Sequence, residues 1–273
     1  MEYDCIETAK RLHDKSFVAD THFDLLPLVW GRRQRGESRV IENRYIPIFK
    51  QGGIDLVVSS LFVSDEYLPE MALRRALDYI SLFYKEMEES PGLFSLCRNV
   101  EEIKKAKSAG MVAVLLSFEG AEPLGNDINL LRIFYELGVR GLGITWSRRN
   151  YAADGCHFEA KEEGQKGGLT NFGVQLLREA EKLGMYIDVS HLNDEGLKDV
   201  LRFYEKPVIA SHSNCRTLAQ SMRNLTDEQI LQIAGRGGII GMNACSEFIK
   251  DSNEEVSARD LADHADHICG LVG

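Results

Sequence analysis

Apolar runs and amphipathic segments alternate along this chain. Short, nearly continuous apolar runs predict buried strands at 17–24, 54–63, 111–118, 139–146, 185–189, 208–210 and 238–244. Apolar residues at helical spacing predict helices at 2–15, 69–89, 127–137, 171–183, 194–204, 227–234 and 258–268. Thr170 and Thr226 stand where N-caps are expected, and Gly184 stands where a helix should end. The arginine-rich stretch 31–36 is predicted to be a solvated loop.

Seven strand–helix alternations are typical of a parallel sheet covered by helices. Neither a G-x-G-x-x-G turn after the first strand nor a Walker motif is present, so nothing supports nucleotide binding. The pattern, without a linker or a shift in composition, predicts one α/β domain over 1–273, a (β/α)8 TIM-type barrel. The eighth strand would follow directly after Gly273, so we expect the chain to be truncated at its C-terminus.

Polar residues stand at the carboxyl ends of four predicted strands, where barrels of this type carry their catalytic groups. These residues are His22, Asp24, Glu119, His191 and His212. Each alone is explained by a helix cap or by a histidine bonded to the backbone. Five of them at one topological level predict a metal site. His13, His264 and His267 fall on helices and are expected to be surface or packing residues, and His157 falls in a loop.

Three imidazoles and two carboxylates exceed what one tetrahedral ion with an open position uses. They suit two metals bridged by one carboxylate, for which Glu119 is the natural choice because it lies between the His-Asp pair and the two later histidines. Nitrogen and oxygen ligands without thiolate favour zinc, with manganese or cobalt as alternatives.

Composition narrows the class of partner. The formal charge of −10 and the lack of a basic stripe argue against a nucleic acid. The six cysteines are scattered without a C-x-x-C pair, the N-terminus is not a secretory signal, and no apolar run approaches the ~20 residues of a membrane helix. We therefore expect a cytoplasmic protein with no membrane partner; a homodimer is left open.

The strings VADTHFDLLP, LLSFEG, GLTNFGVQLLREAEKLGMYIDVSH and PVIASHSNCRTLAQSMRN resemble the membrane dipeptidase (renal dipeptidase) family of amidohydrolase-type metallopeptidases. The likeness covers nearly the whole chain in order. It implies that His22, Asp24 and Glu119 hold one zinc, and that Glu119, His191 and His212 hold the other.

The same resemblance implies that Arg223, eleven residues past the last histidine ligand, clamps the substrate carboxylate. Two positions depart from the family pattern. Trp146 replaces a histidine that helps to stabilise the oxyanion, so Trp146 is expected to face substrate with only an indole N–H to donate. The family's proton-donating Asp follows the eighth strand, so the general acid is expected beyond Gly273.

These features predict a zinc-dependent dipeptidase. Two metals would lower the pKa of a shared water to about 7, and the bridging hydroxide would attack the amide carbon. Glu119 and Arg223 are the expected catalytic residues, and a small dipeptide is the expected substrate. Two alternatives stay open: another metal-dependent amidohydrolase on the same barrel, and a truncated barrel that binds metal or peptide without turnover. Relatives of the first kind more often begin with H-x-H, whereas this chain has H-x-D.

Overall fold

The computed structural model describes residues 2–158, 162, 164–251 and 255–273. The chain forms two compact units, which are described separately below. Unit 1 comprises Met1–Leu61, Ala76–Ser117 and Leu137–Val139, and unit 2 comprises Phe62–Arg75, Phe118–Glu136 and Arg140–Gly273. Four elements, β2, α4, β4 and β5, have residues in both units.

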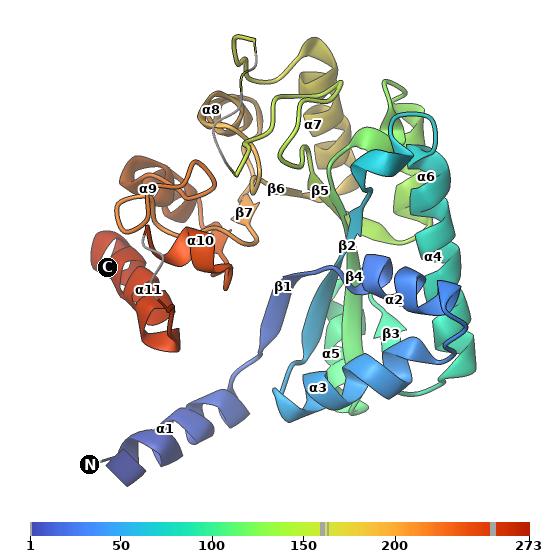
Figure 1. The fold of residues 1–273 in the computed structure, drawn as a ribbon, viewed down its shortest axis with the longest axis vertical. Coiled ribbons are helices and arrows are strands. Elements are labelled where there is room, and N and C mark those ends of the chain that lie inside the picture. Colours follow the sequence, from blue (N-terminus) through green and yellow to red (C-terminus); the bar gives the residue numbers. More distant parts are fainter. Residues whose placement is uncertain (1, 159–161, 163, 252–254) are drawn as a thin grey trace. The chain divides into compact units, whose positions relative to one another are not determined.

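Unit 1 holds the first strands of the parallel sheet and their helices (Figure 1). Its strand order is β1-β2-β4, and β3 pairs with β4 beside this path. Its elements are α1 (Glu2–Lys15), β1 (Ala19–Phe23), α2 (Leu25–Gln34), the π-helical turn η1 (Ile41–Tyr45), α3 (Ile46–Gln51), β2 (Leu56–Phe62), α4 (Ala72–Glu89), β3 (Phe94–Leu96), α5 (Val100–Ser108) and β4 (Val112–Glu119).

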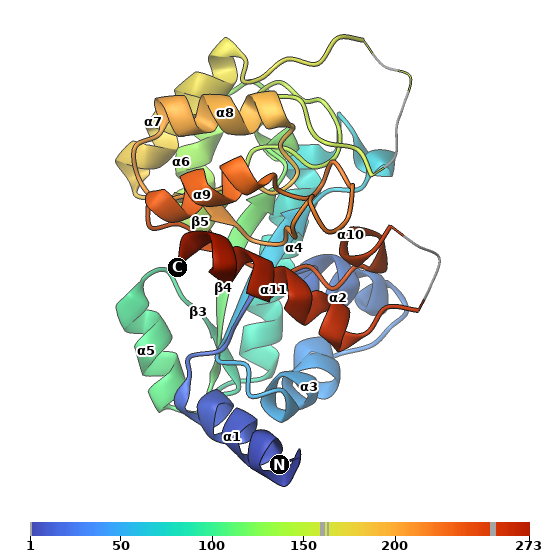
Figure 2. The same cartoon turned by 90° about the vertical axis from the view of Figure 1, so that its left-hand side faces the viewer.

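Unit 2 continues from the end of β4 through β5, β6, β7 and β8 in that order. The pairs β5–β6, β6–β7 and β7–β8 are parallel, with Gly141 opposite Tyr186 and Asp188 opposite Ile209. Helices α9 and α11 lie side by side (Figure 2). The elements are η2 (Asp65–Tyr67), η3 (Glu122–Leu124), α6 (Asn129–Glu136), β5 (Val139–Gly143), α7 (Asn171–Leu183), β6 (Tyr186–Asp188), α8 (Asp194–Phe203), β7 (Ile209–Ala210), α9 (Asp227–Gly235), β8 (Ile239–Ile240), α10 (Ser246–Ile249) and α11 (Ala258–Val272).

Apolar packing fixes the strand end that carries Glu119. Phe118 is buried against Phe134 of α6 in an edge-to-face contact, with ring centroids 4.9 Å apart. Burial of one such ring contributes about 2–3 kcal/mol. Beyond it, the backbone N–H of Gly120 donates to the carbonyl of Gly143 on β5. The carboxylate therefore projects from a strand end that is held on both its side-chain and its backbone side.

The predicted α/β class is confirmed. Across the described residues seven strands follow one another with helices between them, consistent with a TIM-type barrel that lacks one strand. Thr170 and Thr226 are N-caps as predicted, and Gly184 has the left-handed conformation that ends α7. A single domain over 1–273 with a truncated C-terminus stays a prediction.

Several local predictions were wrong. The stretch 31–36 is not a loop throughout, because α2 extends through Gln34, and Arg33 forms ion pairs with Glu86 and Glu89 of α4. Strand β1 is half-buried rather than buried. Strand β3 and helix α5 were not predicted, and the strands predicted at 139–146 and 238–244 end earlier, at Gly143 and Ile240.

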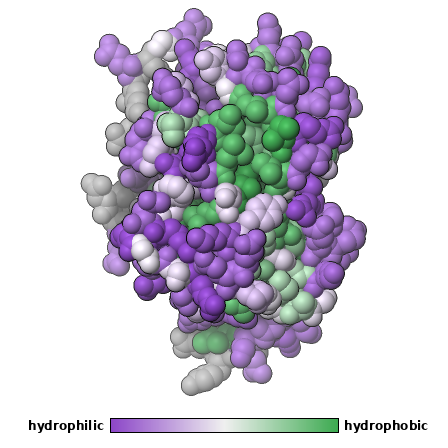
Figure 3. Space-filling model, turned by 90° about the vertical axis from the view of Figure 1, so that its right-hand side faces the viewer, coloured by the Kyte–Doolittle hydropathy of each residue, from purple (hydrophilic) through white to green (hydrophobic). Residues whose placement is uncertain are grey.

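On the face drawn in Figure 3 most side chains are hydrophilic, and hydrophobic side chains gather on part of it. Among the described residues, no helix combines the length and apolar character needed to cross a membrane.

Candidate metal centre

Three predicted ligands meet in unit 2. Glu119 ends β4, His191 follows β6, and His212 follows β7. The Nε2 atoms of the two histidines lie 2.8 Å apart, and Glu119 Oε1 lies 3.1 Å from His191 Nε2 and 4.0 Å from His212 Nε2. All three residues are buried, with 3–9% of the surface of each exposed. These three residues are called the Glu-His-His cluster below.

The backbone at His191 is unusual. Its φ is 71°, in the left-handed region that residues other than glycine rarely adopt. Its carbonyl accepts a 2.7 Å hydrogen bond from the backbone N–H of Cys156, and the N–H of the next residue, Leu192, donates to Val189. A conformation that costs on the order of 1–3 kcal/mol persists only where the surroundings hold it, and such residues concentrate at functional sites.

Serine hydroxyls orient both imidazoles. Ser147 Oγ lies 3.0 Å from His191 Nδ1, and Ser211 Oγ lies 2.7 Å from His212 Nδ1. With each Nδ1 engaged, both Nε2 atoms turn toward Glu119, and the three ligand atoms lie within 4.8 Å of one another. Two imidazole nitrogens and a carboxylate oxygen, with the far ring nitrogens hydrogen-bonded, form a donor set that fits a divalent ion such as zinc.

The other two predicted ligands lie together in unit 1. His22 is the fourth residue of β1, and Asp24 follows the strand as the N-terminal residue before α2. His22 Nε2 is 3.8 Å from Asp24 Oδ1, and Asp24 Oδ1 accepts a hydrogen bond from Ser60 Oγ of β2. The alternation of side chains along β1 thus brings an imidazole and a carboxylate to one side of the strand end, as the spacing predicts.

Arg223 is buried beside the Glu-His-His cluster, with 3% of its surface exposed. Its Nη2 donates to the carbonyl of His212 at 3.4 Å, and its guanidinium carbon lies 5.4 Å from the ring centroid of Phe248. Among the described residues its Nε has no hydrogen-bond partner. Burial lowers the pKa of Arg223, opposed by Cys156 and Glu119. A buried guanidinium with an unused N–H is suited to receive an anion.

Trp146 lies in the loop after β5, close to His191, and its predicted contact with substrate stays a prediction. The centroids of the two rings are 5.9 Å apart, and Trp146 also contacts Phe62 and Phe158. Phe158 in turn stacks on Phe248, with centroids 5.6 Å apart and ring planes 9° from parallel. Two aromatic rings, those of Trp146 and Phe158, therefore lie against His191 and add apolar surface to it.

Arg148 ties together the loops that follow three strands. Its Nε donates to Glu122 at 2.9 Å, its Nη1 to Asp65 at 2.8 Å, and its Nη2 to the carbonyl of Val63 at 2.7 Å. Burial raises the pKa of Glu122 although Arg148 acts against this shift. With all three nitrogens used in this way, Arg148 stabilises the loops next to the site rather than presenting a charge to a ligand.

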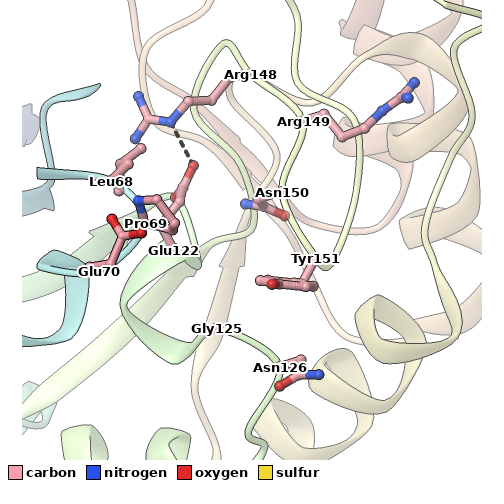
Figure 4. Close-up of a pocket in the computed structure, with 10 residues that line it drawn as sticks. All are labelled: Leu68, Pro69, Glu70, Glu122, Gly125, Asn126, Arg148, Arg149, Asn150 and Tyr151. Carbon is pink, nitrogen blue, oxygen red and sulfur yellow. Dashed lines mark hydrogen bonds and ion pairs between the residues drawn. The ribbon is translucent and has the colours of Figure 1, made fainter. Parts of the chain in front are cut away.

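Glu122 and Arg148 also border a cavity of about 570 Å³, drawn in Figure 4. Figure 4 shows the two side chains meeting on one side of it, with Tyr151 and Asn126 on another. No member of the Glu-His-His cluster is among the described residues that line it, which are Leu68, Pro69, Glu70, Glu122, Gly125, Asn126, Arg148, Arg149, Asn150 and Tyr151.

Comparison with known proteins decides the family. The family model described as membrane dipeptidase, peptidase family M19, matches residues 6–273. The chain belongs to the M19 membrane dipeptidase family. That match extends over nearly all of the sequence, so the M19 assignment includes both the His22–Asp24 pair and the Glu-His-His cluster.

Relatives of this M19 chain are clear but distant. Human dipeptidase 3 is 32% identical over 215 residues, which cover 78% of this chain and 43% of the human protein. The crystal structure of dipeptidase AC, a metallo peptidase of family M19, matches with a TM-score of 0.85 at 28% identity, covering 94% of this chain and 81% of that one. A metallo peptidase from Rhodobacter sphaeroides, bound to a phosphinate mimic of the dipeptide L-Ala-D-Ala, matches with a TM-score of 0.84 at 27% identity, covering 94% and 83%. Among curated relatives the matched part spans 43% to 73% of their own length.

Sequence reasoning missed the residues that support the ligands. Ser147, Ser211 and Arg148 were not singled out, nor was Asp188, whose carboxylate accepts a hydrogen bond from Ser211. A weak signal was available, because a serine directly precedes both His191 and His212. The signal holds for one of the two pairs. Ser211 contacts the ring of His212, which follows it, whereas the ring of His191 is contacted by Ser147, from the loop after β5.

Proposed function

We propose that this chain is a zinc-dependent dipeptidase. The observation that carries the proposal is the position of the buried Arg223, whose guanidinium contacts the backbone of His212 within the Glu-His-His cluster. A cation that can bind a carboxylate thus stands beside residues that could hold a metal. A free dipeptide offers both features, a terminal carboxylate and an amide one residue away. Membership of the M19 family supports the same reading.

Two zinc ions are part of the proposal. His22, Asp24 and Glu119 would hold one, and Glu119, His191 and His212 the other, with manganese or cobalt as substitutes. The support is the His22–Asp24 pair at the end of β1, the Glu-His-His cluster, and the family match across both. When bound, a pair of such ions supplies an activated water near neutral pH and polarises a carbonyl oxygen.

The chain's own residues would do the rest. Arg223 Nε and Nη2 would hold the substrate carboxylate in a bidentate contact, which fixes the distance from that carboxylate to the scissile amide. Glu119 would contribute a ligand to each of the two sets. The ring of Trp146 would bound the substrate side of His191 and exclude water there. An Asp beyond Gly273 as general acid, a cytoplasmic location and a homodimer stay predictions.

A substrate panel tests the function. The protein, loaded with zinc and separately with manganese, is assayed with L-Ala-L-Ala, L-Ala-D-Ala, the amide of L-Ala-L-Ala, a tripeptide, a phosphotriester and a cyclic amide. We expect hydrolysis of the two free dipeptides and little of the other compounds, with loss of activity on chelation. Turnover of the phosphotriester or the cyclic amide without dipeptide turnover would assign a different amidohydrolase. Metal binding without any turnover would assign the non-catalytic alternative.

A further inference from the structure

Three hydrogen-bond donors converge on the buried carboxylate of Asp188, the last residue of β6, which is 6% exposed. Oδ1 accepts from the backbone N–H groups of Ser190 and Ser211, both at 3.0 Å. Oδ2 accepts from the hydroxyl of Ser211. Asp188 thus reaches from β6 to the residue that follows β7, and that residue directly precedes His212.

The direction of these bonds determines where the proton of His212 lies. A serine hydroxyl has one proton to donate, and Ser211 donates it to Asp188. The oxygen of Ser211 can then only accept in its 2.7 Å contact with His212 Nδ1, so Nδ1 must carry a proton. In a neutral imidazole this leaves the lone pair on Nε2, the atom that faces Glu119 and His191.

We infer that Asp188 is a positioning residue that sets the tautomer of His212 through the hydroxyl of Ser211. This inference rests on the proposed function only in taking the Glu-His-His cluster as a metal site. A metal binds the unprotonated nitrogen of an imidazole. A carboxylate that accepts a hydrogen bond from the other ring nitrogen fixes the tautomer and the orientation of the ring. Here Asp188 acts on His212 through the hydroxyl of Ser211 and does not bond the imidazole itself.

The backbone of His212 is held as firmly as its ring. Its N–H donates to Ser190 Oγ at 3.1 Å, and its carbonyl accepts from Arg223 Nη2 and from Asn243 Nδ2, the latter at 3.3 Å. Ser190 is itself bonded to Asp188 through its N–H. The carboxylate therefore holds Ser211, the residue before His212, directly, and it also holds Ser190, whose hydroxyl accepts from the N–H of His212.

The hydroxyl at His191 is not directed by a carboxylate. Ser147 Oγ is 3.0 Å from His191 Nδ1, and among the described residues Ser147 contacts no carboxylate. The direction of this bond depends instead on His191 Nε2, which lies 2.8 Å from His212 Nε2 and donates to it when that nitrogen is bare. The two imidazoles of the cluster differ in this respect. Ser147 is accordingly the matched control for Ser211, since each is a hydroxyl on the Nδ1 of one cluster histidine.

The two hydrogen bonds that link Asp188 to Ser211 and Ser211 to His212 are called the relay below. Replacement of Asp188 by asparagine should reverse the direction of both bonds. The amide oxygen can keep both backbone N–H bonds, while the amide nitrogen takes the place of Oδ2 and donates to Ser211. The serine proton must then turn to His212 Nδ1, and the imidazole proton moves to Nε2. Ser211→Ala instead removes the relay without reversing it.

The test uses the full chain, stripped of metal, with ¹⁵N-labelled histidine. In the wild type we expect the ring ¹⁵N shifts of His212 to show a protonated Nδ1, and in Asp188→Asn a protonated Nε2. Zinc affinity, measured by competition with a chromogenic chelator, should fall about 10- to 100-fold in Asp188→Asn. We expect a smaller fall in Ser211→Ala and no change in the His212 tautomer in Ser147→Ala.

An unchanged His212 tautomer and unchanged zinc affinity in Asp188→Asn would overturn the inference. Should that variant fail to fold by circular dichroism, the same two readouts in Ser211→Ala decide, and wild-type values there would overturn it equally. The proposed function fails separately. A protein whose tautomer responds as expected but which cleaves no dipeptide keeps the relay and loses the dipeptidase, whereas an active enzyme indifferent to Asp188→Asn keeps the dipeptidase and loses the relay.

Discussion

His191 Nε2 and His212 Nε2 lie 2.8 Å apart, although 21 positions separate the residues along the chain. The parallel pairing of β6 and β7 brings the two strand ends to one edge, and a hydroxyl on each Nδ1 turns both rings inward. Without a cation the pair can share one hydrogen bond, in which one Nε2 donates and the other accepts. In the proposed metal site both nitrogens would instead bind one cation, with Glu119 as the third ligand.

Replacement of Glu119 by glutamine should reduce both bound metal and activity. The amide is nearly isosteric but carries no charge, so it cannot neutralise or bridge cations. We expect kcat/KM on L-Ala-L-Ala to fall by at least about 100-fold, which is equivalent to about 2.7 kcal/mol of transition-state stabilisation. Metal content by atomic emission should fall in parallel. Glu122→Gln, three residues further on and bonded to Arg148, is the control and should retain its metal; full activity in the Glu119 variant would remove its bridging role.

Replacement of Arg223 by alanine should discriminate between substrates. A hydrogen bond to a charged group contributes about 1.5–3 kcal/mol, so the loss of kcat/KM on a free dipeptide is expected to be about 10- to 100-fold. The C-terminal amide of the same dipeptide has no carboxylate to lose and serves as the control substrate. An equal loss on the acid and on the amide would show that Arg223 does not read the carboxylate.

The pair formed by Asp194 and Arg216 predicts a pH-dependent stability. Burial raises the pKa of Asp194, but bonds from both Arg216 Nη atoms at 2.8 Å, and from Gln229 Nε2, outweigh it and leave the pKa below its usual value. A carboxylate with a lowered pKa stabilises the fold above about pH 4, and this contribution is lost as the pH falls through the folded-state pKa.

Asp194→Asn should therefore lower the free energy of unfolding at pH 7 by about 1–2 kcal/mol, a figure reduced for the partial exposure of the pair. The difference from wild type should shrink at pH 3. Urea titrations at the two pH values measure it, and Arg216→Met should reproduce the same pattern from the other side of the pair. A gap of equal size at both pH values would mean that the charge of Asp194 contributes nothing.

The cysteines should differ sharply in reactivity. Burial raises the pKa of Cys215 to about 12, and its thiol donates to the carbonyl of His264. Because the thiolate is the nucleophile, iodoacetamide at pH 8 should leave this residue unmodified in the native protein. The exposed Cys5, Cys245 and Cys269 should react, as mass spectrometry of the digested protein would show. Labelling in urea is the control and should reach all six; rapid native labelling of Cys215 would mean that this part of unit 2 opens readily.

Local signals with a defined backbone role were predictable from sequence. The hydroxyl of Thr170 accepts from the N–H of Gly173, and Thr226 forms a capping box with Gln229. Gly184 ends α7 at a φ of 74°. The order of the ligand residues at strand ends was also readable, because continuous apolar runs stop where the polar residues begin.

The missed elements have identifiable causes. Helix α2, which was not predicted, contains Pro27, but a proline in the first turn of a helix removes only an N–H that has no intrahelical partner. Helix α5 carried a readable start, since Asn99 accepts from the N–H of Glu102, but β3 before it has only three residues. A strand of three residues is too short for an alternation of apolar and polar residues to be recognised in the sequence.

The contact between Asp188 and Ser211 was not predictable. It depends on which strands are neighbours and on the register between them, and neither follows from spacing along one chain. His264 makes the same point. It was expected at the surface or in packing, and it is fully buried, with Nδ1 accepting from the N–H of Cys215 on a distant loop.

The left-handed backbone of His191 has a consequence for the proposed binding of a metal ion. A short peptide with the same residues would seldom visit that conformation, so its imidazole would have to be ordered at the moment of binding. In the folded chain, the hydrogen bond from Cys156 has already fixed it. A metal ion would therefore bind an imidazole whose backbone is already ordered, and binding would not have to supply the free energy of ordering it. A glycine at position 191 would relieve the backbone strain, but it would also remove the imidazole.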